Sequence, residues 1–195
     1  MKIEKIVKKF LDQHADPERP LLCALSGGVD SLCLFHLLKN YAKLTVAHVD
    51  HGWRDESAEE AEALRALADS YKIPFYLKVL DSDSLAGNLE DACRQERIGF
   101  FVECAREIGA QAAILGHHAD DQAETVLKRV FEGAFFDKIS GMKPTTLMRG
   151  VPFWRPLLTI SKKEIVEWMT GQGFEWMEDV TNLDSAIYGL ACGTV

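Results

Sequence analysis

Six consecutive residues near the N-terminus have the composition of a loop that binds phosphate. They are Ser26, Gly27, Gly28, Val29, Asp30 and Ser31, and they separate a short apolar run from a helical pattern. The two glycines permit tight turns and a close approach of backbone N–H groups to an anion. The serines add hydroxyl donors, and Asp30 could hold a Mg²⁺ ion that bridges to phosphate. The loop lacks the Gly-Lys-Ser/Thr ending of a Walker A motif, and an ordinary glycine turn with a helix cap is the alternative.

A second polar cluster, residues 48–54, follows the next apolar run of the chain. It contains His48, Asp50, His51 and Arg54. At the carboxyl end of a parallel strand, these side chains would face the same crevice as the phosphate loop. A polar loop with a capping aspartate explains this cluster equally well.

The third cluster, residues 116–125, reads Gly-His-His-Ala-Asp-Asp-Gln-Ala-Glu-Thr and opens a predicted helix. Asp121 and Glu124 are three residues apart, so their carboxylates share one helix face. Such a pair can hold an ammonium group or a metal ion, and it can take a proton from an amine. An acidic first turn that complements the helix dipole is the alternative, but it explains only one of these acids well.

Two arginines, Arg94 and Arg97, lie one turn apart on another predicted helix. Their guanidinium groups could clamp a phosphate or a nucleotide. A solvated pair on the helix surface is an equally good explanation from spacing alone.

The elements that must position these clusters alternate along the chain. Short apolar runs predict buried strands at residues 21–25, 44–49, 75–80 and 112–115. Helical spacing or composition predicts helices near residues 1–14, 32–38, 56–71, 88–108, 119–131 and 161–171. Glycines and prolines predict loops between residue 133 and the last helix. The alternation indicates an α/β fold with a doubly wound, Rossmann-like parallel sheet.

The bulk composition indicates one globular domain over the 195 residues, with a core at about residues 21–188. No apolar stretch is long enough to cross a membrane, and residues 1–14 are lysine-rich and lack the pattern of a signal peptide. The five cysteines form no C-x-x-C pair and no zinc spacing. We therefore expect a cytoplasmic protein without a structural disulfide.

The net charge of −8 argues weakly against a nucleic-acid partner, but the charge is unevenly distributed. Between Lys128 and Lys163 there are eight lysines and arginines and only two acidic residues. This basic segment could contact the phosphates of a nucleic acid, although charge alone favours a simple solvated surface.

The hexapeptide at residues 26–31 resembles the PP-loop of N-type ATP pyrophosphatases, which cleave ATP between the α and β phosphates. Residues 48–54 and 116–125 resemble two motifs of the tRNA(Ile)-lysidine synthetases, although Trp53 stands where that family has leucine. Arg94 and Arg97 resemble the family's A-R-x-x-R helix. Residues 155–158 and 178–184 resemble later segments of the same family.

This resemblance implies an enzyme that uses ATP and Mg²⁺ to join free L-lysine to the wobble cytidine of tRNA(Ile) with a CAU anticodon. The implied metal residue is Asp30, and Asp121 and Glu124 are implied to place lysine. The implied nucleotide contacts, beyond residues 26–31, come from His48, Asp50, Arg94, Arg97, Gly116 and His117.

The sequence departs from the family after Tyr188, where Arg-Asn is expected and residues 189–195 differ. Longer family members continue into tRNA-contacting C-terminal regions, and we expect the lack of such regions to weaken the capture of tRNA. Three alternatives therefore stay open. One is a tRNA thiolase of the 2-thiocytidine type, although those enzymes carry C-x-x-C cysteines. The others are an amide-forming synthetase of the same fold and a truncated fragment that binds ATP without turnover.

Overall fold

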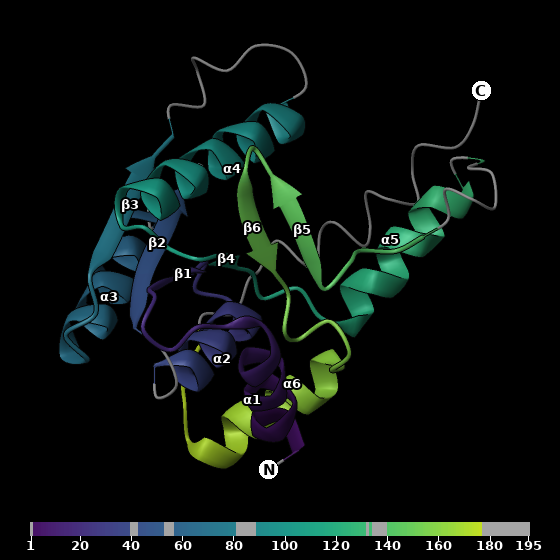
Figure 1. Cartoon of the computed structure of the whole chain (residues 1–195), viewed down its shortest axis with the longest axis horizontal. Helices are drawn as coiled ribbons and strands as arrows, with labels where there is room; N and C mark the ends of the chain where they lie inside the picture. Colours follow the sequence, from purple (N-terminus) through teal and green to yellow (C-terminus); the bar gives the residue numbers. More distant parts are fainter. Residues whose placement is uncertain are drawn as a thin grey trace.

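The computed structural model describes residues 2–39, 43–52, 57–80, 89–131, 133 and 140–176. Within these residues six strands form one sheet in the order β3-β2-β1-β4-β6-β5 (Figure 1). The strands are β1 (Leu21–Ala24), β2 (Leu44–Asp50), β3 (Phe75–Val79), β4 (Ala113–Ile114), β5 (Thr145–Met148) and β6 (Val151–Trp154). Every neighbouring pair is parallel except β5 and β6. The predicted α/β class and parallel sheet are therefore confirmed.

The strand order reverses direction between β1 and β4. The chain runs outward from β1 through β2 to β3, and then returns to place β4 on the other side of β1. A ligand site in such a sheet lies beyond the carboxyl ends of the two strands at this switch point. The phosphate loop follows β1, and the third polar cluster follows β4. Both predicted motifs therefore lie at the switch point.

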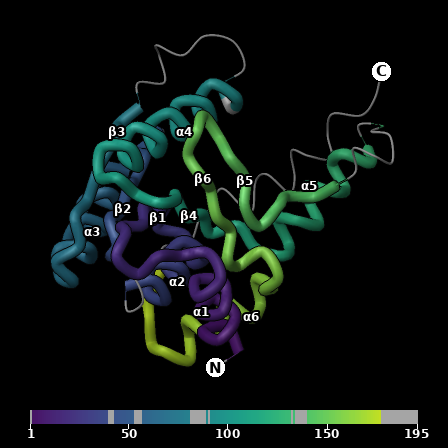
Figure 2. The backbone as a smooth tube through the Cα atoms, in the orientation of Figure 1, coloured from purple at the N-terminus to yellow at the C-terminus, as the bar shows by residue number. Residues whose placement is uncertain are grey.

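Helices cover both faces of the sheet. The described helices are α1 (Lys2–His14), α2 (Val29–Leu38), α3 (Ser57–Ser70), α4 (Leu89–Glu107), α5 (Ala119–Phe131) and α6 (Lys162–Gln172), and all except α5 contribute to this cover. One hydrophobic cluster joins α1, α2, α3 and α6 to the sheet, and a second cluster joins α4 to the opposite face. Figure 2 shows α1, α2 and α6 gathered together and α4 apart from them.

Strands β1 and β4, which lie inside the sheet, are apolar on both sides because both of their faces are covered. In β1, Leu21 and Cys23 belong to the cluster of α1 and α2, whereas Leu22 belongs to the cluster of α4. This alternation is the period of two that a strand imposes on its side chains. It explains why the predicted strands appear in the sequence as continuous apolar runs.

The hairpin of β5 and β6 corrects one prediction, because this region was expected to be loop. Met148 pairs with Val151, so Arg149 and Gly150 form a two-residue turn. Both residues have positive φ, 49° and 83°, as a type I′ turn requires. Arginine is an unusual first residue for that turn, and Pro152 within β6 also argued against a strand.

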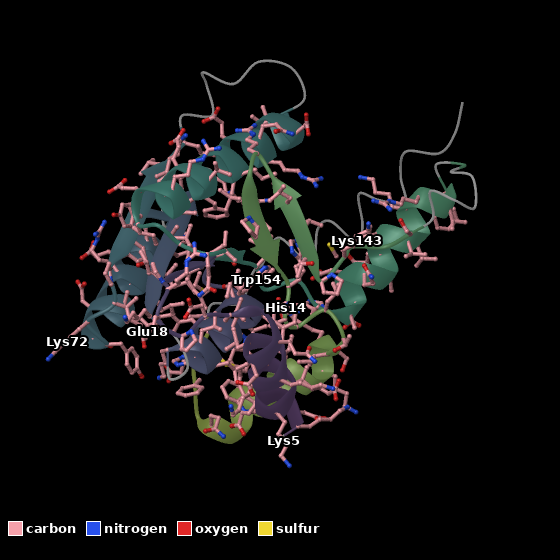
Figure 3. All side chains as sticks on the ribbon, viewed as in Figure 1. Lys5, His14, Glu18, Lys72, Lys143 and Trp154 are labelled. Carbon is pink, nitrogen blue, oxygen red and sulfur yellow. The ribbon has the colours of Figure 1, made fainter. Side chains whose placement is uncertain are left out.

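The hairpin is anchored to the rest of the fold through Trp154. The indole lies edge-on to Phe10 of α1 at 6.0 Å between ring centroids. It also lies 6.1 Å from the ring of His14, beside which it appears in Figure 3.

None of the described helices is long and apolar enough to cross a membrane. Trp53, Arg54 and residues 178–195 lie outside the described residues.

Candidate active site

The phosphate loop leaves the N-terminus of α2 open. Gly27 has a φ of 91°, a conformation that a side chain would strain. Gly28 is the N-cap residue, and no side chain forms a capping hydrogen bond there. The first N–H groups of a helix have no partner within the helix and carry the positive end of its dipole. The end of α2 can therefore receive an anion.

The two serines of the loop bond to the loop itself. The Ser31 hydroxyl donates to the Gly28 carbonyl at 2.9 Å, and it accepts from the Ser26 N–H at 3.1 Å. The Ser26 hydroxyl donates to Ser31 Oγ at 3.1 Å. These bonds use the hydroxyl protons that were predicted to contact phosphate. The backbone N–H groups are thus the donors left for an anion.

The loop after β4 touches the phosphate loop at Gly116. A Cβ atom on Gly116 would lie 3.1 Å from the Ser31 nitrogen and 3.2 Å from the Asp30 carbonyl carbon. Such contacts are with backbone, which cannot easily move aside. Glycine at this position therefore lets the two motifs meet.

His118 joins the two motifs through its side chain. Its Nδ1 atom accepts the Asp120 N–H at 3.2 Å, so the neutral ring carries its proton on Nε2. Nε2 lies 3.6 Å from Asp30 Oδ1 and 3.6 Å from Asp121 Oδ2. The buried ring thus lies between Asp30, the predicted metal ligand, and Asp121, one of the two acids predicted to bind the lysine substrate. The sequence placed His118 in a motif, but its spacing did not show this bridging role.

The acid pair of α5 divides into a capped and a free carboxylate. Asp121 Oδ2 accepts the His118 N–H at 2.8 Å, which caps the start of the helix. Glu124 is exposed one turn later, and it makes no hydrogen bond or ion pair with any described residue. The alternative explanation, an acidic first turn, therefore fits Asp121 in part and leaves Glu124 unexplained.

Lys162 is a site residue that the sequence did not identify. Its Nζ atom lies 2.7 Å from Asp30 Oδ2, and its N–H donates to Asp120 Oδ2 at 2.7 Å. The lysine opens α6, which Ser161 and Glu164 hold with a capping box. Because it lies 132 residues from Asp30 in sequence, only the fold reveals the contact.

Cationic groups line another part of the site. The pKa of His117 is lowered to about 4, mainly by burial and then by the nearby Arg155 and Arg97 guanidinium groups, against an opposing effect of Asp121. Arg155 is buried, and its Nη1 donates to Thr146 Oγ1 at 2.9 Å. Its Nε has no hydrogen-bond partner among the described residues, and neither has His117 Nδ1.

The predicted clamp, Arg94 and Arg97, contributes to this cationic group. The charge of Arg94 lowers the pKa of Arg155, after the larger effect of burial. Burial followed by the charge of Arg97 lowers the pKa of His51. Neither arginine forms an ion pair with a carboxylate in the described part of the chain. Guanidinium groups that lie together without carboxylates favour a bound anion.

His48 and Asp50, at the end of β2, bond to the backbone that precedes the phosphate loop and to the backbone that follows β2, respectively. The His48 Nδ1–H donates to the Leu25 carbonyl at 2.7 Å, and burial lowers the pKa of the imidazole. Asp50 Oδ1 accepts the Gly52 N–H at 2.8 Å and forms the capping turn that was left open as an alternative. Both residues are buried. A nucleotide contact stays a prediction for them, and their described contacts are with protein backbone.

Comparison with known proteins agrees with this arrangement. Residues 1–188 match the PP-loop domain family. The chain therefore belongs to the PP-loop domain family.

Similar proteins from two bacteria carry the same name. A tRNA(Ile)-lysidine synthase of Protochlamydia amoebophila (strain UWE25) is 45% identical over 91% of this chain and 40% of the relative. A tRNA(Ile)-lysidine synthase of Chlamydia trachomatis serovar L2 is 44% identical over 86% of this chain and 53% of the relative. The chain therefore spans about half the length of these relatives.

A solved structure shows the same fold. The U34-tRNA thiolase NcsA from Methanococcus maripaludis, with its [4Fe-4S] cluster, superposes with a TM-score of 0.75. It covers 91% of this chain and 64% of that protein at 19% identity. At this identity the likeness concerns the arrangement of the elements.

The family implies that ATP binds to this PP-loop domain, and the residues present fit a nucleotide with Mg²⁺. Asp30 Oδ1 is buried and has no hydrogen-bond partner among the described residues. No group of three or more His, Cys, Asp or Glu side chains in the described ranges could hold a metal ion by itself. Mg²⁺ is commonly held by one or two carboxylates together with substrate phosphates and water. Asp30 beside the open end of α2 offers that combination.

Proposed function

We propose that this PP-loop domain carries the ATP and lysine sites of a tRNA(Ile)-lysidine synthase. Such an enzyme joins free L-lysine to C2 of the wobble cytidine of a tRNA(Ile) with a CAU anticodon. The observation that carries the proposal is the bridge of His118 between Asp30 and Asp121. It joins a phosphate loop to an acid pair, as a reaction of ATP with an amine requires. The named relatives support the choice of this reaction.

In the first step, the cytosine O2 attacks the α-phosphorus of ATP and pyrophosphate leaves. The α2 N-terminus and the backbone of residues 27–30 stabilise negative charge on the phosphates. We assign Mg²⁺ to Asp30, where it would neutralise charge on the same phosphates. Arg94, Arg97 and His117 lie on the cationic side and contact the nucleotide. The product of this step is an adenylated tRNA.

In the second step, the lysine ε-ammonium group loses a proton, its nitrogen attacks C2, and AMP leaves with the oxygen. A protonated amine has no lone pair, so it must first lose a proton. Asp121 and Glu124 hold the ammonium group on one helix face, and Glu124 is the carboxylate free to accept the proton. His118 keeps Asp121 oriented, because its ring and its N–H both contact that carboxylate.

The tRNA approaches along the basic segment. Four residues of this segment lie on α5, just before β5, or in the turn of the β5–β6 hairpin: Lys128 and Arg129, Lys143, and Arg149, respectively. Phosphate contacts from such side chains supply much of the affinity of nucleic-acid binding. ATP, tRNA and free lysine are all cytoplasmic, and we place the reaction there.

The buried cysteines disfavour the thiolase alternative. Burial raises the pKa of the Cys23 and Cys33 thiols to about 12 and that of Cys104 to about 11. Sulfur transfer by cysteine uses the thiolate, which such surroundings suppress. Cys93 is also buried. None of these four thiols is therefore suited to carry sulfur.

The test measures incorporation of radiolabelled lysine into a tRNA(Ile) transcript in the presence of ATP and Mg²⁺. We expect labelled tRNA with the CAU anticodon and none with a transcript in which uridine replaces the wobble cytidine. Release of AMP should depend on the tRNA. ATP–pyrophosphate exchange without tRNA would instead indicate an amide-forming synthetase. ATP binding without any turnover or tRNA binding would indicate a nucleotide-binding fragment.

A further inference from the structure

The phosphate loop contains no cation of its own. A Walker A loop ends in a lysine that reaches the β and γ phosphates, and residues 26–31 contain no lysine or arginine. They contain Asp30 instead, whose negative charge repels phosphate. A loop of this composition needs a cation from another part of the fold if it is to hold a triphosphate.

Lys162 is placed to be that cation. Its ammonium group lies 2.7 Å from Asp30 Oδ2, at the edge of the phosphate loop. The lysine side chain is 41% exposed and that of Asp30 is 24% exposed, so the pair faces solvent at the site. We propose that Lys162 is a phosphate-binding residue of the ATP site. This inference rests on the proposed binding of ATP at residues 26–31.

The backbone of Lys162 is fixed although its side chain is long and flexible. The Lys162 N–H donates to Asp120 Oδ2, and the Ala119 N–H donates to the Ile160 carbonyl at 2.9 Å. Ser161 and Glu164 hold the first turn of α6 through reciprocal bonds. The start of α6 is therefore tied to the start of α5, and the flexible stem of the lysine spans the gap to Asp30.

The two oxygens of the Asp30 carboxylate have different neighbours. Oδ2 binds Lys162, whereas Oδ1 is buried beside His118 Nε2 at 3.6 Å. An ammonium on Oδ2 offsets the repulsion that Asp30 would exert on a phosphate. A Mg²⁺ ion held by Asp30 would supply the positive charge that the carboxylate needs, and the flexible stem of Lys162 would then let its ammonium group reach a phosphate oxygen. Lys162 thus makes a charged contact to the pyrophosphate part of ATP.

The neighbouring Lys163 provides a matched control. It lies on the same turn of α6, its side chain is 85% exposed, and it pairs with Glu167 at 3.8 Å. Among the described residues it makes no contact with the phosphate loop, so its loss removes the same charge from the same helix without touching the loop. Comparison of Lys162→Met with Lys163→Met therefore separates the specific contact from a change in net charge.

The experiment measures the affinity for α,β-methylene-ATP, which cannot be cleaved between the α and β phosphates, by calorimetry in Mg²⁺. We expect Lys162→Met to weaken binding by roughly 10- to 100-fold, as for the loss of one charged hydrogen bond. Lys163→Met should stay within about twofold of wild type, and Lys162→Arg should restore part of the loss, since it keeps the charge.

Binding of AMP distinguishes a phosphate contact from a structural role. AMP lacks the β and γ phosphates, so Lys162→Met should leave its affinity unchanged. Equal losses for AMP and the ATP analogue would overturn the inference, because they would indicate a distorted site. Unchanged affinity of Lys162→Met for the analogue would also overturn it and leave the proposed function intact. Failure of the wild-type protein to bind the analogue would reject both.

Discussion

The two halves of the site are held in different ways. Every residue of α2 except Asp30 is buried, so the helix that carries the phosphate loop lies within the core. No residue of α5, which carries Asp121 and Glu124, is buried. Leu127 and Phe131 of α5 are 54% and 85% exposed, and the helix extends away from the sheet (Figure 1).

We infer from this difference that the phosphate loop on α2 is rigid, whereas the α5 helix that carries the acid pair can adjust its position. The core fixes the backbone donors before a nucleotide binds, which is favourable for charge stabilisation. The α5 helix is held by polar contacts: Ala119 and Asp120 bond to the start of α6, and the side chains of Gln122 and Arg129 bond to the backbone of residues 140–142. A helix held by polar contacts without buried apolar side chains has a lower local stability than a core helix, so it can adjust to a tRNA and an amino acid.

The largest expected effect tests this contrast through stability. Leu34→Ala in α2 removes a fully buried side chain and should lower the free energy of unfolding by about 2–5 kcal/mol. Leu127→Ala in α5 should change it by less than about 0.5 kcal/mol, because the side chain is already largely in water. Chemical denaturation of both variants gives the comparison. Similar losses would show that α5 packs as firmly as α2.

A smaller effect is expected where the two halves touch. Gly116→Ala would push a methyl group against the backbone of Asp30 and Ser31, and such overpacking costs about 1–3 kcal/mol. We expect both stability and ATP affinity to fall. Gly171→Ala in α6 is the control, because a Cβ there meets nothing within 4 Å. An alanine helps a helix, so this variant should be unchanged or more stable. Normal ATP binding by Gly116→Ala would contradict the close contact.

The smallest effect concerns the pH dependence of stability. The pKa of His117 is about 4 in the fold, against an ordinary value near 6.5. Between these values the unfolded chain binds a proton that the folded chain does not, so stability falls as the pH is lowered from 6.5 toward 4. We expect His117 to account for roughly 1–2 kcal/mol of the loss between pH 7 and pH 5. His117→Asn should reduce that slope, as denaturation at both pH values would show. An unchanged slope would mean that His117 is protonated in the fold.

The sequence predicted the parts of the fold that local patterns determine. Continuous apolar runs correctly predicted four of the parallel strands, and the glycines of residues 26–31 predicted the loop between β1 and α2. The β5–β6 hairpin was missed because Arg149 takes the positive φ that usually marks asparagine or glycine. Lys162 was missed because its partner lies far away in sequence and only tertiary packing brings them together. The bridging position of His118 also depends on two strands of the sheet.

The central claim is that the phosphate loop and the acid pair serve different steps. The most direct test follows adenylated tRNA and lysidine separately in an Asp121→Asn, Glu124→Gln double variant, with labelled ATP and saturating tRNA. We predict that the variant forms adenylated tRNA at close to the wild-type rate and accumulates it without joining lysine. Normal formation of lysidine, or equal loss of both steps, would contradict the division of the site.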